Sequence, residues 1–139
     1  TVDAVPVRII IGSAYGQTSP VKQFAETLYI EASLKAGQSL VLPQAAERAL
    51  YIAAGKVQAR DQLLSQYEMA VLDGHSEVSI EALEDSRIAL IGGEAMQRRF
   101  IEWNFVSSRK ERIEQAKSDW QQGKFPKVPG DESEFIPLP

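Results

Sequence analysis

One stretch of the sequence decides the fold class: Thr27-Leu28-Tyr29-Ile30-Glu31-Ala32-Ser33-Leu34. Every second residue of it is apolar, namely Leu28, Ile30, Ala32 and Leu34. Because alternate side chains of a strand point to opposite faces of a sheet, this pattern predicts a strand with one buried face.

Similar short apolar runs recur outward from this stretch. They cover residues 7–11, 39–42, 49–54, 67–72, 78–83, 87–91 and 100–106. Turn-forming residues separate them, at Gly12, Gly37, Gly55, Asp73-Gly74 and Gly92-Gly93. Short strands with turns at this spacing predict an all-β fold, an antiparallel sandwich or barrel, rather than strands alternating with crossover helices.

Length and composition predict a single domain over residues 1–139. The chain is 44% apolar and 24% charged, which is enough for one hydrophobic core and too short for two. No apolar run approaches the ~20 residues of a membrane-spanning helix, and the N-terminus has no signal-peptide pattern. The sequence contains no cysteine, which excludes disulfides and zinc–thiolate sites and fits a reducing compartment. We expect a cytoplasmic protein without membrane contact.

The charges are unevenly distributed. Residues 98–127 hold eight Lys/Arg against four Asp/Glu, whereas the remaining residues hold seven against fifteen. The net charge of −4 argues against nucleic-acid binding. The basic segment predicts instead a contact with an acidic partner, made by Arg98, Arg99, Arg109, Lys110 and Arg112. The alternative is a solvated helix face without a partner.

A helix is predicted at about 108–122. Ser108 and Glu111 have the spacing of a capping box, Gly123 is a natural stop, and Pro126 prevents continuation. An apolar stripe on this helix is expected to dock on the outside of the sheets, and it consists of Ile113, Ala116 and Trp120.

The tail, residues 124–139, contains four prolines, which exclude regular helix and central strand. It is also too apolar for a disordered end, because it contains Phe125, Val128, Phe135, Ile136 and Leu138. We expect an extended, Pro-rich tail that lies along the domain.

Several ordered motifs carry a resemblance to a known family. They are Trp103-Asn104-Phe105-Val106-Ser107-Ser108, Lys110-Glu111-Arg112-Ile113, Ala116-Lys117, Asp119-Trp120, Gly123, Phe125, Val128-Pro129-Gly130-Asp131 and Glu134-Phe135-Ile136-Pro137-Leu138-Pro139, preceded by Gly92-Gly93-Glu94. The chain resembles the carboxy-terminal domain of the pirin family. This resemblance implies a cupin-type jelly-roll barrel, the second of two stacked barrels. In that family the amino-terminal barrel carries the metal ligands.

The resemblance also locates the positions where a cupin would hold its metal. Pro43 and Ala45 stand where the first two histidines are expected, Glu47 or Arg48 at the carboxylate, and Asp85 at the last histidine. These residues predict a domain with no metal and no cofactor, and without the quercetinase-like dioxygenase activity reported for some pirins. We hypothesise that Arg48 and Asp85 pair in the barrel mouth; alternatively, both point to solvent.

Other catalytic arrangements have weaker support, so no catalytic residue is predicted. His75, the single histidine, lies in a predicted hairpin turn. Glu84 and Asp85 are adjacent, so a strand would direct them to opposite faces. Gly92-Gly93-Glu94 lacks the lysine and helix of a phosphate loop.

Three functions remain open at this level. The first is a metal-free module for assembly or small-ligand binding, expected to form a homodimer through the face that meets the amino-terminal domain in two-domain pirins. The second is one half of a split dioxygenase that needs a separate metal-bearing cupin partner. The third is a protein-interaction domain like the transcription co-regulators described among pirins, which would use the basic segment.

Overall fold

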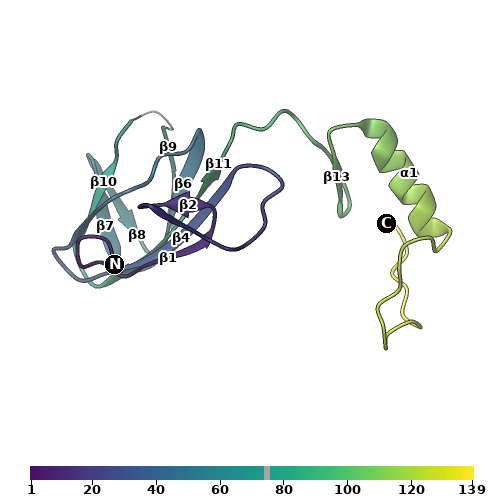
Figure 1. The fold of residues 1–139 in the computed structure, drawn as a ribbon, viewed down its shortest axis with the longest axis horizontal. Coiled ribbons are helices and arrows are strands. Elements are labelled where there is room, and N and C mark those ends of the chain that lie inside the picture. The colour runs from purple at the N-terminus through teal and green to yellow at the C-terminus, as the bar shows by residue number, and fades with distance from the viewer. Residues whose placement is uncertain (74–75) are drawn as a thin grey trace. The chain divides into compact units, whose positions relative to one another are not determined.

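The computed structural model describes residues 1–73 and 76–139, and the chain divides into two compact units (Figure 1). Unit 1 is Thr1–Ala95 and consists of strands and loops. Unit 2 is Met96–Pro139 and consists of a hairpin, a helix and a tail. The single domain expected over 1–139 stays a prediction.

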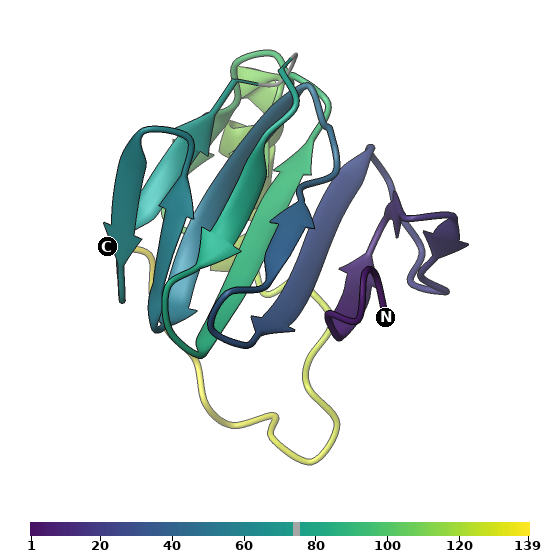
Figure 2. The same cartoon turned by 90° about the vertical axis from the view of Figure 1, so that its left-hand side faces the viewer.

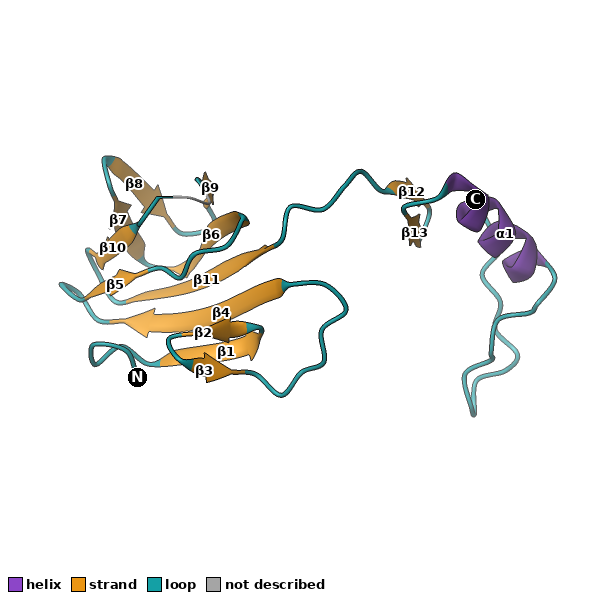
Figure 3. Cartoon of the chain, turned by 45° about the horizontal axis from the view of Figure 1, so that its top comes forward, coloured by secondary structure: helices purple, strands orange, loops and turns teal. Residues whose placement is uncertain are grey.

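The larger sheet of unit 1 has the strand order β1-β4-β11-β6-β9, with all neighbours antiparallel (Figure 2). Its strands are β1 (Val7–Ile11), β4 (Thr27–Leu34), β6 (Glu47–Ala54), β9 (Met69–Leu72) and β11 (Ser86–Gly93). The second sheet has the order β5-β10-β7-β8 (Figure 3). Its strands are β5 (Ser39–Val41), β7 (Lys56–Ala59), β8 (Gln62–Ser65) and β10 (Ser79–Ala82). A short ribbon pairs β2 (Ser13–Ala14) with β3 (Gln17–Thr18).

The hydrophobic core of unit 1 joins the inner faces of both sheets in one cluster. The larger sheet contributes Leu28, Ile30, Leu50, Ile52, Ile88 and Leu90, and the smaller one Leu40, Val57, Leu64 and Ile80. These residues alternate with half-buried or exposed ones along each strand. The all-β sandwich predicted from the alternation is therefore confirmed.

The sequence located most strands of unit 1 but missed two hairpins, the short β2–β3 ribbon and the β7–β8 pair. The strands predicted at 7–11 and 27–34 have the observed bounds, while β7 and β8 were not predicted. Their connecting turn places Arg60 in the left-handed region, at φ 52°, where Gly or Asn is the usual signal. The turn predicted around His75 includes residues 74 and 75, which lie outside the described residues.

The strand predicted at 100–106 is in fact a hairpin of unit 2, with β12 (Phe100–Glu102) paired to β13 (Phe105–Ser107). Trp103 turns the chain at φ 52°. Its ring packs edge-on against Phe105, with centroids 5.5 Å apart, and against Trp120 at 5.1 Å. These ring contacts offset the strain of a bulky residue in the left-handed region.

The helix of unit 2, α1 (Lys110–Gln121), lies within the predicted range, but its predicted capping box is wrong. The N-cap residue is Arg109, which is still extended and has no side-chain cap bond, so Ser108 lies one residue too early to cap the helix. The C-terminal stop at Gly123 is confirmed. Gly123 has φ 64°, its N–H donates to the Trp120 carbonyl, and the Lys124 N–H donates to the Asp119 carbonyl, which is a Schellman motif.

The apolar stripe of α1 contacts the β12–β13 hairpin of its own unit, and Ile113 is its buried member. Docking of this stripe on the sheets of unit 1 stays a prediction. Within the described residues, no helix has the length and hydropathy needed to cross a membrane.

Candidate functional site

Arg48 is the one charged side chain that is buried among the described residues, with 2% of its surface exposed. It lies near the start of β6 on the same face as Leu50 and Ile52, which are completely buried in the core. Because residues two apart in a strand share a face, β6 directs the guanidinium toward the interior of the sandwich, at the end where β6 begins. We call this end the barrel mouth.

The guanidinium of Arg48 makes five hydrogen bonds, one for each of its N–H groups. Nη1 donates to the carbonyl oxygens of Pro43 at 2.7 Å and Leu42 at 3.4 Å. Nε and Nη2 donate to the Asp73 carbonyl at 3.3 and 3.0 Å, and Nη2 also donates to the Ser76 carbonyl. Arg48 therefore ties the segment before β6 to the segment after β9.

Burial lowers the pKa of Arg48, and the nearby charge of Arg60 lowers it further, while Asp73 raises it. Arg60 reaches the same segment as Arg48, because its Nη2 donates to the Ser76 hydroxyl and, at 3.1 Å, to the Glu77 carbonyl. An arginine keeps its proton at physiological pH even when its pKa falls. The barrel mouth thus contains a permanent positive charge.

The predicted pair of Arg48 and Asp85 is wrong. Arg48 is opposite Gly92 in the sheet register, whereas Asp85 precedes the other end of β11, roughly 20 Å away along the strand. The exposed carboxylate of Asp85 accepts hydrogen bonds from Lys35 Nζ at 2.6 Å and the Ala36 N–H at 3.1 Å. These two bonds, Lys35 first, lower the pKa of Asp85. The sequence spacing did not reveal which end of the strand Asp85 would occupy.

The other predicted metal positions lie near Arg48 but supply no imidazole. Pro43 and Ala45 are half-buried, and Glu47 is exposed. A Cβ on Gly92 would lie 3.0 Å from the Ala45 Cβ, so this corner is tightly packed. Within residues 1–73 and 76–139, no three His, Cys, Asp or Glu side chains are grouped as a metal would need. The described residues at these positions therefore do not fit a transition metal, which binds imidazole and carboxylate together.

Comparison with known proteins identifies the family. Residues 29–126 match the Pirin C-terminal cupin domain. A "Pirin-like protein" of Caulobacter vibrioides is 46% identical over 133 residues, which cover 95% of this chain and 46% of that protein. The chain belongs to the pirin family. The resemblance found in its sequence is thereby confirmed, and this pirin chain spans about half the length of the curated relatives it matches.

Solved structures show the same fold for this pirin chain. A crystal structure of quercetin 2,3-dioxygenase from Acinetobacter baumannii has a TM-score of 0.82 at 22% identity, covering 99% of this chain and 48% of that one. A second structure of quercetin 2,3-dioxygenase from that organism has a TM-score of 0.77 at 24% identity. The match covers 86% of this chain and 43% of that one. At such identities the likeness concerns the cupin fold alone.

The basic residues of this pirin chain lie in two places in unit 2, the loop before β12 and the start of α1. Arg98 and Arg99 precede β12, and the Arg99 Nη1 donates to the Gln97 carbonyl at 2.7 Å. Arg109, Lys110 and Arg112 are exposed at the start of α1. Their contact with an acidic partner stays a prediction.

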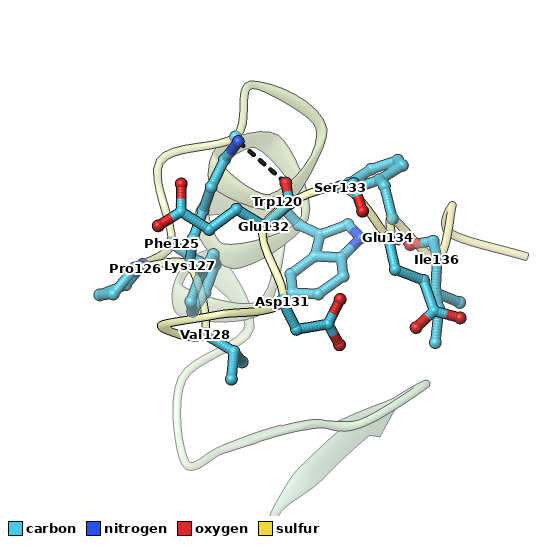
Figure 4. A pocket seen from close by; sticks show the side chains of 12 residues that line it. Trp120, Phe125, Pro126, Lys127, Val128, Asp131, Glu132, Ser133, Glu134 and Ile136 are labelled. Atoms are coloured by element: carbon cyan, nitrogen blue, oxygen red, sulfur yellow. Dashed lines mark hydrogen bonds between the residues drawn. The ribbon is translucent and has the colours of Figure 1, made fainter.

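Sequence reasoning missed a pocket of about 390 Å³ in unit 2 (Figure 4). It is lined by the end of α1 and the tail, and Trp120 and Phe135 are among its walls. The prolines and apolar residues of the tail predict an extended segment along the domain, but the segment turns at Val128–Asp131. The pirin tail folds back onto Trp120, whose Nε1 donates to the Ile136 carbonyl at 2.8 Å.

Proposed function

We propose that this chain is a metal-free cupin module of the pirin type that does not catalyse a reaction by itself and serves in assembly. The observation that carries the proposal is the guanidinium of Arg48 at the barrel mouth, with all five N–H groups bonded. A cupin metal site needs neutral imidazoles and a carboxylate at this end of the barrel. Here a fixed cation, Arg48, occupies one of the two positions expected for the carboxylate, the other being Glu47.

Electrostatics oppose a metal at this position. Two like charges repel strongly in a site from which water is excluded, so a divalent cation would enter beside Arg48 at a cost. The carbonyl oxygens that line the mouth are already used by the arginine. The described residues at the barrel mouth therefore supply neither the donors nor the charge for the dioxygenase chemistry named for the structural relatives.

Metal analysis tests this part of the proposal. The purified chain is incubated with excess Fe²⁺, Ni²⁺ or Mn²⁺, dialysed, and measured by inductively coupled plasma mass spectrometry. We expect far less than one metal ion per chain for each metal. One tightly held ion per chain that protects against urea unfolding would overturn the metal-free proposal.

The outer face of the larger sheet is the assembly surface that we propose. Two rows cross it through the strand register: Tyr29, Ile91, Ala49 and Val71 in one, and Glu31, Ala89, Tyr51 and Met69 in the other. Val71, Met69 and Ile91 are 87%, 54% and 44% exposed. Adjacent exposed apolar side chains of this kind are typical of an interaction surface. We call this surface the outer sheet face.

A second copy of this chain is the occupant that best suits the outer sheet face. In a two-fold dimer each apolar row meets an identical row. The charged corner of the face is also self-complementary, because Glu31 lies between Arg8 at 3.8 Å and Arg87 at 3.2 Å and thus presents both signs. Sedimentation velocity tests the dimer, which we expect at micromolar concentrations; a monomer would overturn it.

A second candidate function is supported by the length of this chain relative to that of its matched relatives. Because this chain spans about half of its matched relatives, a separate cupin half with intact metal ligands would restore a two-barrel arrangement. In this case the chain would form one side of the active site of a two-chain dioxygenase. A quercetin-oxidation assay of a metal-loaded cupin half, with and without this chain, distinguishes the two functions, because only the split enzyme gains activity on mixing.

A further inference from the structure

The tail of unit 2 forms a closed loop over the end of α1. The Schellman motif at Gly123 reverses the chain, and a second turn follows at Val128–Asp131, where the Asp131 N–H donates to the Val128 carbonyl at 3.0 Å. The loop then returns to Trp120, whose Nε1 holds the Ile136 carbonyl at 2.8 Å. The hollow inside this loop is the pocket of about 390 Å³, and we call it the tail pocket.

Aromatic rings form the floor of the tail pocket. Trp120 stacks on Phe135, with centroids 5.7 Å apart and planes 23° from parallel, and meets Phe125 edge-on at 5.7 Å. Phe125 stacks in turn on Phe105, which fixes its position from the hairpin side. In Figure 4 the Trp120 indole lies at the centre of the view, with the tail around it. The rings that line the pocket are therefore held in place by one another.

The rim of the tail pocket is acidic. Its charged residues are Asp131, Glu132, Glu134 and Lys127. The ammonium of Lys127 donates to the main-chain carbonyl of Glu132 at 3.2 Å, as the dashed line in Figure 4 marks. Among the described residues, none of the three carboxylates takes part in a salt bridge. The rim thus has a net charge of −2 with its negative groups available.

We propose that the tail pocket binds a small organic ammonium ion. The negative faces of aromatic rings attract a cation, and carboxylates at the rim add to this attraction. Methyl or methylene groups around the charge can pack against the apolar floor of the pocket, whereas a hydrated metal ion cannot. The volume is in the range of small-ligand sites. This site uses no residue of unit 1, so it is independent of the metal-free proposal.

Choline and its uncharged isostere dimethylbutanol, in which a carbon replaces the quaternary nitrogen, test the charge requirement. Each is titrated into the full ¹⁵N-labelled chain and followed by NMR. We expect choline to shift the amides of residues 123–136 and the Trp120 indole N–H, and to bind about tenfold more tightly than the isostere. Equal affinities, or shifts confined to other residues, would overturn the proposal.

Variants test the assigned residues. The double variant Asp131→Asn, Glu134→Gln should lose most of the preference for choline while still binding the isostere weakly, which shows that the pocket is folded. Glu111→Gln, which removes an acid exposed on α1, should bind choline like the parent chain. Unchanged choline affinity in the double variant would overturn the assignment. If a trilysine peptide bound the same residues more tightly than choline, the proposed ligand would be wrong. The result would indicate a basic segment of a protein partner instead.

Discussion

Arg48 occupies an inward position of β6 at which the alternation of the strand requires an apolar residue. A buried guanidinium without partners would destabilise the fold, but here every N–H has a carbonyl acceptor. Arginine suits this position because its five donors point in fixed directions, whereas lysine has three donors on a single atom. The residue is thus structural, and it joins the segments before β6 and after β9 at the barrel mouth.

Replacing Arg48 tests this role. We expect Arg48→Met to lower the free energy of unfolding by about 3 kcal/mol, because buried carbonyl oxygens lose their donor, and Arg48→Lys to recover only part of it. Urea denaturation followed by circular dichroism measures the loss. The control is Arg87→Met, which removes an exposed guanidinium 3.2 Å from Glu31 and should cost at most about 1 kcal/mol. Equal losses at the two positions would contradict this role.

We expect Tyr15 to make the free energy of unfolding depend on pH in the alkaline range. Its hydroxyl donates to the Val41 carbonyl at 2.7 Å, and burial, followed by the charge of Asp3, raises its pKa to about 12. Because the folded pKa lies above the ordinary value of 10.0, the unfolded chain loses this proton first. The contribution of Tyr15 is therefore complete below pH 10 and is lost as the pH rises towards 12.

Urea titrations at a series of pH values from 8 to about 12 measure this dependence. Tyr15→Phe should unfold with a shallower pH dependence above pH 10 than the parent chain, and should be about 1 kcal/mol less stable at pH 8 because the hydrogen bond is lost. Tyr67→Phe is the control, because Tyr67 is 72% exposed. The same steep decline in Tyr15→Phe as in the parent chain would rule out this residue as the cause.

Elements with strict apolar alternation were predictable from the sequence, and elements fixed by individual contacts were not. β4 was located to the residue, because only a strand buries one face of such a pattern. β1 was located to the residue as a short apolar run that ends before Gly12. The β7–β8 and β12–β13 hairpins turn at Arg60 and Trp103, which lack the usual turn signal. The expected metal positions followed from the family spacing alone. Three of the five carbonyl contacts of Arg48, by contrast, are made to Asp73 and Ser76, which lie more than 20 residues away in the sequence.

The left-handed conformation of Gly123 is expected to stabilise the C-terminal end of α1. Gly123 has φ 64°, and no atom lies within 4 Å of a Cβ placed there, so Gly123→Ala adds backbone strain alone. We expect this variant to destabilise unit 2 by about 1 kcal/mol and Gly123→Asn by less. Tryptophan fluorescence during urea unfolding reports on this unit, because Trp103 and Trp120 are the only tryptophans in the chain.

The neighbouring residue is the matched control for the helix end. Gln122 has φ −89°, which any residue adopts, so Gln122→Ala should change the fluorescence transition by less than about 0.5 kcal/mol. An equal loss in Gln122→Ala and Gly123→Ala would show that the Schellman geometry is not what stabilises the end of α1.

Charge and apolar surface are distributed unequally over the whole molecule. Residues 1–95 hold seven Lys/Arg against twelve Asp/Glu, whereas residues 96–139 hold eight against seven. Two copies that meet through unit 1 therefore bring net negative charges together. The apolar rows of the outer sheet face must supply most of the attraction, to which the charges around Glu31 add only locally. Because salt screens like-charge repulsion, we expect a dimer of this type to tighten as the salt concentration rises.

Lysine substitutions on the outer sheet face test the dimer directly. Val71→Lys with Ile91→Lys places two charges in one row, with Ala49 between them in the register, so burying that row would desolvate both ammonium groups. We expect sedimentation velocity to show a monomer, with an unchanged circular dichroism spectrum. The control is Leu63→Lys, because Leu63 is 50% exposed on β8 of the other sheet and should leave the dimer intact. If the double variant remained dimeric while Leu63→Lys became monomeric, the interface would lie on the smaller sheet instead.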